Sequence, residues 1–220
     1  MQRGFGMNIF KIKKKTDYNA EKRNKMINYE YLNKHYCKDG QTVLAGDSIT
    51  EIFNHTELYA DYISKNSKAV YNRGISGDTS DKLLERFDCN VLNIHPSNIV
   101  LLIGTNDFAY GLTMDDTIHN IAAILELIFE KCSDTNVILQ AVYPINERIK
   151  KQGRRTNKAI SQLNRRLKNL AEQYNVTYID LTESLSDNSG QLKDAFTYDG
   201  LHPTVFGFKV VAEKIIPLLK

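Results

Sequence analysis

Short apolar runs recur along this chain and alternate with segments of helical periodicity. The clearest run, 99–103, is an unbroken row of Ile, Val and Leu, which is typical of a strand buried on both faces of a parallel sheet. Strands that alternate with helices favour a parallel sheet covered by helices on both sides. We therefore predict a three-layer α/β/α sandwich of flavodoxin-like type, with five parallel strands at 42–46, 69–73, 98–103, 136–142 and 176–180.

Helical periodicity predicts what lies between the later strands. Apolar residues recur at helical spacing from Ile118 to Cys132, after Thr113 and Asp116, which fit a capping box. A second stripe runs from Ile160 to Tyr174. A last helix is predicted to begin at Pro203, a favoured first helical position, and to bury Phe206, Val210, Val211, Ile215 and Ile216.

An extra helix is predicted at 17–36, ahead of the first strand. We expect it to pack on the core or on a partner subunit, so that a homodimer is one arrangement it allows. The 220 residues contain no internal repeat and no low-complexity linker. We therefore divide the chain into an N-terminal extension, 1–40, and one globular domain, 41–220.

The composition of the chain excludes several functional classes of protein. A net charge of +3 is too small for the basic stripe of a nucleic-acid-binding protein, and we expect the basic run at 11–15 to be solvated. Three scattered cysteines without CxxC spacing indicate reduced thiols, not a disulfide framework or a metal site. The chain lacks the apolar segment of a signal peptide and any apolar run of membrane-spanning length. We expect a cytoplasmic protein without stable membrane insertion.

The first strand ends in the sequence GDSIT, which places Ser48 on a glycine turn. A serine hydroxyl is a weak nucleophile and needs a neighbouring base. The nucleophile elbow of α/β-hydrolases has the pattern Gly-x-Ser-x-Gly, whereas this chain has Thr50 at the second glycine position. By itself, the motif also fits a strand-to-helix turn in which Ser48 is a cap.

Near the end of the chain, the sequence DGLHP places Asp199 and His202 three residues apart. Residues at this spacing can project to the same side of one turn, so Asp199 can orient the imidazole of His202. With Ser48, they supply the nucleophile, base and orienting acid of a serine hydrolase. Alone, this motif also fits a loop before a helix.

Two further motifs follow predicted strands and supply hydrogen-bond donors. Gly77 lies in GISGDT after the second strand, and Asn106 lies in GTND after the third. The backbone N–H of Gly77, the side-chain amide of Asn106 and the N–H of Ser48 can together stabilise a tetrahedral oxyanion. The alternatives are a simple turn at Gly77 and a helix cap or Asx turn at Asn106.

Because ligands bind at the carboxyl ends of parallel strands, three further residues are candidates for binding substrate: Phe108, Tyr143 and Arg148. Asp47, Asp78 and Asp107 adjoin the proposed site residues. We expect them to bind backbone donors and brace their loops, without transferring protons.

The four blocks GDSIT, GISGDTS, IGTND and DGLHP resemble the motifs of the SGNH, or GDSL-type, hydrolases over about residues 42–216. The double-glycine second block is most similar to the branch with acetylhydrolases and carbohydrate esterases. The resemblance implies that 41–220 is an SGNH hydrolase domain, with Ser48 as nucleophile, His202 as base, Asp199 as its orienting acid, and Gly77 and Asn106 as oxyanion donors.

The motifs predict a carboxylic ester hydrolase that needs neither metal nor cofactor. We expect it to remove a short acyl group such as acetate from a carbohydrate or small-molecule ester. Two alternatives are a lysophospholipase or acetylhydrolase acting on lipid, and a catalytically silent binding module on the same fold.

Overall fold

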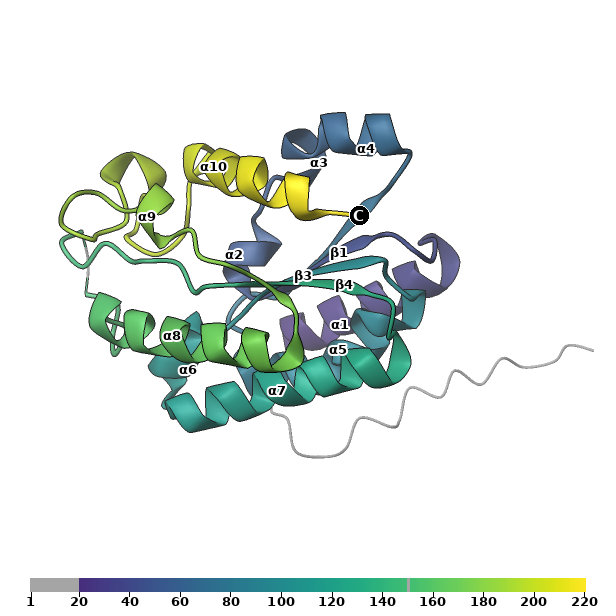
Figure 1. The fold of residues 1–220 in the computed structure, drawn as a ribbon, viewed down its shortest axis with the longest axis horizontal. Helices are drawn as coiled ribbons and strands as arrows, with labels where there is room; N and C mark the ends of the chain where they lie inside the picture. The colour runs from purple at the N-terminus through teal and green to yellow at the C-terminus, as the bar shows by residue number, and fades with distance from the viewer. Residues whose placement is uncertain (1–19, 150) are drawn as a thin grey trace, which may run out of the picture.

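Five parallel strands form one sheet at the centre of the computed structural model (Figure 1), which describes residues 20–149 and 151–220. The strand order is β2-β1-β3-β4-β5, which is the flavodoxin-like order, and the predicted fold class is confirmed. The basic run at 11–15 and the start of the helix predicted at 17–36 lie outside the described residues. The strands are β1 Thr42–Gly46, β2 Val70–Gly74, β3 Asn98–Leu102, β4 Asn136–Gln140 and β5 Thr177–Ile179.

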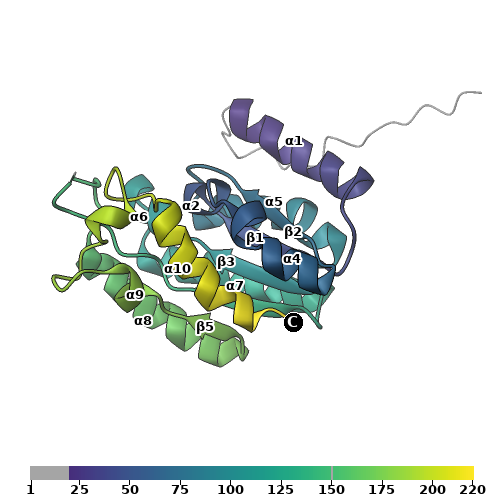
Figure 2. The ribbon, with the colours of Figure 1, turned by 90° about the horizontal axis from the view of Figure 1, so that it is seen from above.

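Helices cover both faces of the sheet, as Figures 1 and 2 show. The long helices α7 and α8 run along one face, and α10 crosses the other. The helices of the first face are α5 Ser80–Asn90, α7 Met114–Lys131 and α8 Asn157–Tyr174. Those of the second face are α2 Ser48–Glu51, α3 His55–Leu58, α4 Ala60–Asn66, α9 Thr182–Leu185 and α10 Val205–Ile215, while α6 Thr105–Tyr110 follows β3.

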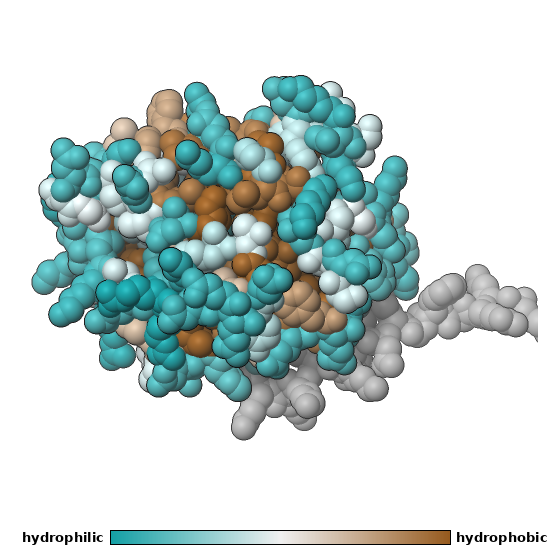
Figure 3. Space-filling view, viewed as in Figure 1, coloured by the Kyte–Doolittle hydropathy of each residue, from teal (hydrophilic) through white to brown (hydrophobic). Residues whose placement is uncertain are grey.

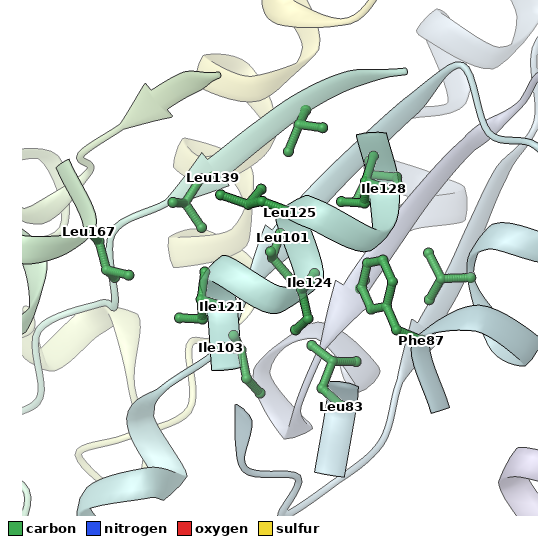
Figure 4. Close-up of a cluster of buried hydrophobic side chains, with 14 of the residues drawn as sticks. Leu83, Phe87, Leu101, Ile103, Ile121, Ile124, Leu125, Ile128, Leu139 and Leu167 are labelled. Carbon is green, nitrogen blue, oxygen red and sulfur yellow. The ribbon is translucent and has the colours of Figure 1, made fainter. Parts of the chain in front are cut away.

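Each face of the sheet has its own apolar core. On the first face, side chains of β3 and β4 pack against α5, α7 and α8 (Figure 4). The predicted stripes on α7 and α8 supply much of this layer, and the Thr113–Asp116 capping box at the start of α7 is present. On the second face, α10 and the helices after β1 bury a separate cluster that includes Phe53, Tyr59 and Phe208. This double burial explains why the central strands β1, β3 and β4 are mainly apolar.

The N-terminal helix α1 (Ala20–His35) packs outside α5 beside the β2 edge of the sheet (Figure 2). The contact is polar as well as apolar. The buried Asn33 accepts two hydrogen bonds from Arg73 of β2 and donates one to the carbonyl of Asn90 on α5. Tyr29 donates to the carbonyl of Gly74 at the end of β2. The helix is therefore attached to the same strand end that leads to Gly77.

The last helix differs from its prediction, because α10 begins at Val205 with Thr204 as its N-cap. Pro203 instead forms an isolated antiparallel bridge with Thr197, which closes the loop containing His202. The buried face also differs from the prediction: Phe206 is 63% exposed, and Val210 and Ile216 are only partly buried. The core positions are Phe208, Val211, Ala212 and Ile215.

Apolar residues reach the surface around α10, where they are surrounded by hydrophilic ones (Figure 3). Val205 and Phe206 are the exposed apolar residues at the start of this helix, a few positions after His202. Among the described residues, no helix has both the length and the apolar character needed to cross a membrane.

Candidate active site

Ser48 lies directly after β1, where the chain turns into the single turn of α2. Asp47 is the N-cap of this turn, and its side chain accepts a hydrogen bond from the N–H of Ile49 at 2.9 Å. A Cβ at Gly46 would lie 2.2 Å from both the carbonyl oxygen of Leu102 and the hydroxyl of Thr50. Glycine is thus required at 46 by close packing, and Thr50 fills the space beside it, where the α/β-hydrolase elbow has its second glycine.

The structure brings Ser48, His202 and Asp199 into one hydrogen-bonded chain. The Oγ of Ser48 lies 2.9 Å from Nε2 of His202, although 154 residues separate them in sequence. Nδ1 of His202 lies 2.7 Å from Oδ2 of Asp199. Ser48 is 8% exposed, whereas His202 is partly open to solvent. A substrate can therefore approach the serine along the side where the histidine is exposed.

Asp199 is held by several donors besides the imidazole. Its Oδ1 accepts the backbone N–H groups of Leu201 and His202, both at 2.9 Å. Burial alone would raise the pKa of Asp199, but the hydrogen bonds from the His202 side chain and from these two N–H groups outweigh it and lower the pKa to about 2. Asp199 therefore remains a carboxylate that keeps the imidazole in one orientation.

The predicted oxyanion donors lie in the loops that follow β2 and β3, the two strands that flank β1. Gly77 has a φ of +74°, a conformation that glycine adopts readily, in the turn before Thr79. The amide nitrogen of Asn106 donates to the carbonyl of Asp78, the residue after Gly77, at 2.9 Å. The same nitrogen lies 3.4 Å from Oδ2 of Asp47, next to Ser48 in sequence. Asn106 thus connects the Gly77 loop to the serine turn.

Three buried aspartates support these loops, as their sequence positions indicated. Asp107 accepts from the N–H and hydroxyl of Ser80, and Asp78 accepts from Arg86 at 2.7 Å. Burial, together with the charges of Asp78 and Asp107, raises the pKa of Asp47 to about 7, against the effect of its bond from Ile49. Asp47 and Asp107 accept backbone N–H groups, as expected, whereas Asp78 binds side chains of α5 and α1 instead.

The three predicted substrate-binding residues lie in different surroundings. Phe108 is a partly buried residue of α6 that packs against the first apolar core. Tyr143 is 3% exposed, packs in the second core, and donates its hydroxyl to Gln140. Arg148 is exposed and forms ion pairs with two aspartates, Asp187 and Asp194. A contact of these residues with substrate stays a prediction.

Sequence reasoning missed several side chains that support the site. Arg155 donates to the side-chain oxygen of Asn106, and Gln152 donates to the carbonyl of Asp199. Arg86 is fully buried and connects Asp78 to the carbonyl of Gly46. Lys22 of α1 reaches Asp78 from outside the sheet. None of these residues lies in a recognisable motif, since each reaches its partner through a long side chain from a distant segment.

The arrangement has the parts needed to cleave an ester by acyl transfer. It contains a hydroxyl in contact with an imidazole and a carboxylate that orients the ring, with the candidate donors Gly77 and Asn106 in the loops after the neighbouring strands. Within 20–149 and 151–220, no group of three or more His, Cys, Asp or Glu side chains is placed to bind a metal ion. The fold and this site are those of an SGNH-type ester hydrolase.

Comparison with known proteins agrees with that class. A model of the GDSL-like lipase/acylhydrolase family matches residues 44–210, and the chain belongs to this family. A solved structure from Streptococcus pneumonia, provisionally described as a platelet activating factor, superposes with a TM-score of 0.84 at 30% identity. The match covers 91% of this chain and 93% of that one.

Two curated relatives have more specific names. The chain is 25% identical to platelet-activating factor acetylhydrolase IB subunit alpha1 of Homo sapiens, over 83% of this chain and 76% of the relative. It is 28% identical to an acetylxylan esterase of Geobacillus stearothermophilus, over 67% of this chain and 70% of the relative. Both matches agree with an esterase family, and neither fixes a substrate.

Proposed function

We propose that this esterase uses Ser48 to remove short acyl groups, most simply acetate, from a carbohydrate or another small-molecule ester. The observation that carries the catalytic part is the hydrogen-bonded chain from Ser48 through His202 to Asp199. The short-acyl part is supported by the names of two relatives, which refer to acetyl esters.

The reaction proceeds in two halves. Nε2 of His202 takes the proton of Ser48 as Oγ attacks the ester carbonyl, and the oxyanion is met by the N–H groups of Ser48 and Gly77 and the amide of Asn106. The tetrahedral intermediate collapses, and the alcohol leaves with the proton from His202. Water, deprotonated by His202, then attacks the acyl-serine. As the second tetrahedral intermediate collapses, His202 returns that proton to Oγ of Ser48 and the carboxylic acid is released.

A lipid ester is the second candidate. Val205 and Phe206 are exposed a few residues after His202, and an apolar rim of this kind can contact a lipid substrate. The human relative named as a platelet-activating factor acetylhydrolase is consistent with this alternative. In this second candidate, the acyl group that is removed is still short, but the alcohol of the ester is a lipid instead of a sugar or small molecule.

An ester panel tests both candidates. Initial rates would be measured on p-nitrophenyl esters from acetate to palmitate, on acetylated xylan and monosaccharides, and on an acetylated ether phospholipid. Ser48→Ala and His202→Ala are the matched controls. We expect hydrolysis to fall steeply beyond butyrate and to be lost in both variants.

The results separate the alternatives. A higher rate on palmitate than on acetate contradicts the short-acyl proposal. A clear preference for the acetylated phospholipid over every acetylated sugar selects the lipid alcohol. A wild-type rate no higher than that of Ser48→Ala on all esters means that the chain is a binding module on an esterase fold.

A further inference from the structure

The loop between β4 and α8 contacts both halves of the catalytic site. Gln152 donates to the carbonyl of Asp199, on the acid–base side. Arg155, three residues later, donates through Nε to the carbonyl of Thr105 at 2.9 Å and through a terminal nitrogen to Oδ1 of Asn106 at 2.7 Å. Its other terminal nitrogen lies 3.4 Å from the carbonyl of Gln152. All three donating nitrogens of Arg155 therefore have acceptors within this loop and α6.

The amide of Asn106 has two orientations of nearly equal shape but opposite chemistry. When the amide nitrogen faces the oxyanion, its N–H stabilises the tetrahedral intermediate. When the amide oxygen faces the oxyanion, the two oxygens repel each other. Arg155 can only donate hydrogen bonds, so its partner in the amide of Asn106 must be the oxygen, Oδ1. On the opposite side, the carbonyl of Asp78 can only accept and so selects the nitrogen. A flipped amide would place oxygen against oxygen and nitrogen against a guanidinium.

From these contacts we propose that Arg155 is a positioning residue. It fixes the amide of Asn106 so that the N–H not bonded to the carbonyl of Asp78 faces the oxyanion, and it strengthens that N–H as a donor. The second effect follows because a cation on Oδ1 polarises the amide and makes its N–H groups better donors. This proposal rests on the proposed function, in which Asn106 is an oxyanion donor.

The test is a double-mutant cycle on p-nitrophenyl acetate. The variants are Arg155→Met, which keeps the chain length and removes every donor, and Asn106→Ala, singly and together. Arg155→Lys restores one donor, and Arg154→Met is the matched control, because Arg154 is the adjacent, exposed arginine. The free energy of unfolding of each variant is measured by urea denaturation, so that rates are compared only between folded proteins.

We expect Arg155→Met to lower kcat about 10- to 100-fold with KM changed less than about twofold, since removing an oxyanion donor outright costs about 10²–10³ in rate. In the Asn106→Ala background, the same change should lower kcat less than about threefold, because the group that Arg155 positions is already absent. Arg155→Lys should recover part of the rate, and Arg154→Met should match the wild type.

Three results would overturn the role of Arg155: an unchanged kcat in Arg155→Met, an equal loss of kcat with and without Asn106, or a loss confined to KM. The second indicates a general structural role, and the third a direct contact with substrate. Ser48→Ala, assayed in parallel, separates this proposal from the proposed function. If Ser48→Ala keeps the wild-type rate, the proposed function fails and the role of Arg155 fails with it. If Ser48→Ala is inactive, a failure at Arg155 leaves the proposed function standing.

Discussion

At the scale of single residues, the site depends on carboxylates with opposite behaviour. Asp199 accepts the imidazole and two backbone N–H groups, which lower its pKa to about 2. Asp47, one residue before the serine, is buried near two other acidic groups, and its pKa is raised to about 7. One carboxylate is thus fixed as an anion beside the base, and the other exchanges a proton near neutral pH.

Replacing Asp199 with Asn tests its part in orienting His202. The asparagine can present an N–H group to Nδ1 and so favour the wrong tautomer of the ring. The same aspartate-to-asparagine change in the triad of a serine protease lowers kcat by about 10⁴. We expect a loss of at least about 10³-fold in kcat on p-nitrophenyl acetate. Asp115→Asn, at an exposed position on α7, should leave kcat unchanged. A loss of less than tenfold in Asp199→Asn would contradict the orienting role.

The raised pKa of Asp47 predicts a dependence of stability on pH. Between about pH 4 and 7 the unfolded chain has lost this proton and the folded protein retains it, so this residue destabilises the fold increasingly as pH rises through that window. Asp47→Asn keeps an N-cap acceptor but does not titrate. Urea denaturation should show the stability of the variant rising relative to the wild type, by on the order of a few kcal/mol, from pH 4 to 7. A difference that is constant with pH would show that Asp47 ionises normally.

The residues of the proposed catalytic chain could be named from the sequence because each belongs to a short local pattern after a strand or before a helix. Arg155 and Arg86 could not be named from the sequence, because their long side chains bond to groups far away in sequence and no motif indicates these contacts. For Tyr143, the position after β4 could be predicted but the burial of its side chain in the second core could not, and its contact with substrate stays a prediction.

At the scale of elements, the strands and the two long helices could be predicted within a residue or two from periodicity alone. Helix α5 was not singled out, because Arg86 and Asn90 are buried on it beside Leu83 and Phe87 and interrupt its apolar pattern. The start of α10 was misplaced because the bridge between Thr197 and Pro203 is a tertiary contact. In both elements, polar contacts with other parts of the chain determine the structure more than the local sequence pattern does.

The attachment of α1 to the sheet depends on Asn33, whose side chain binds Arg73 and the carbonyl of Asn90. Asn33→Ala leaves the buried guanidinium of Arg73 without this acceptor, which should lower the free energy of unfolding by about 2–3 kcal/mol. Asn28→Ala, at an exposed position of the same helix, is the control and should cost under about 0.5 kcal/mol. Equal effects of the two changes in urea denaturation would mean that α1 is not held by this contact.

At the scale of the whole molecule, the fold converts distant segments into one site. The serine turn follows β1, the loops with the proposed oxyanion donors follow β2 and β3, and the histidine loop precedes α10. Because β1 and β3 are neighbours with their connections on opposite sides, their carboxyl ends form the crevice in which open α/β sheets bind ligands. Ser48 and His202, which are 154 positions apart in sequence, therefore come within hydrogen-bond distance only in the folded chain.

The central claim, that folding turns Ser48 into an activated nucleophile, is tested most directly by covalent labelling with a fluorophosphonate, followed by peptide mass spectrometry. We predict one label per chain, located on Ser48, with esterase activity lost in proportion to labelling. The His202→Ala variant and the urea-unfolded protein should remain unlabelled under the same conditions. A label on a different residue, or full hydrolysis of p-nitrophenyl acetate by Ser48→Ala, would contradict the account.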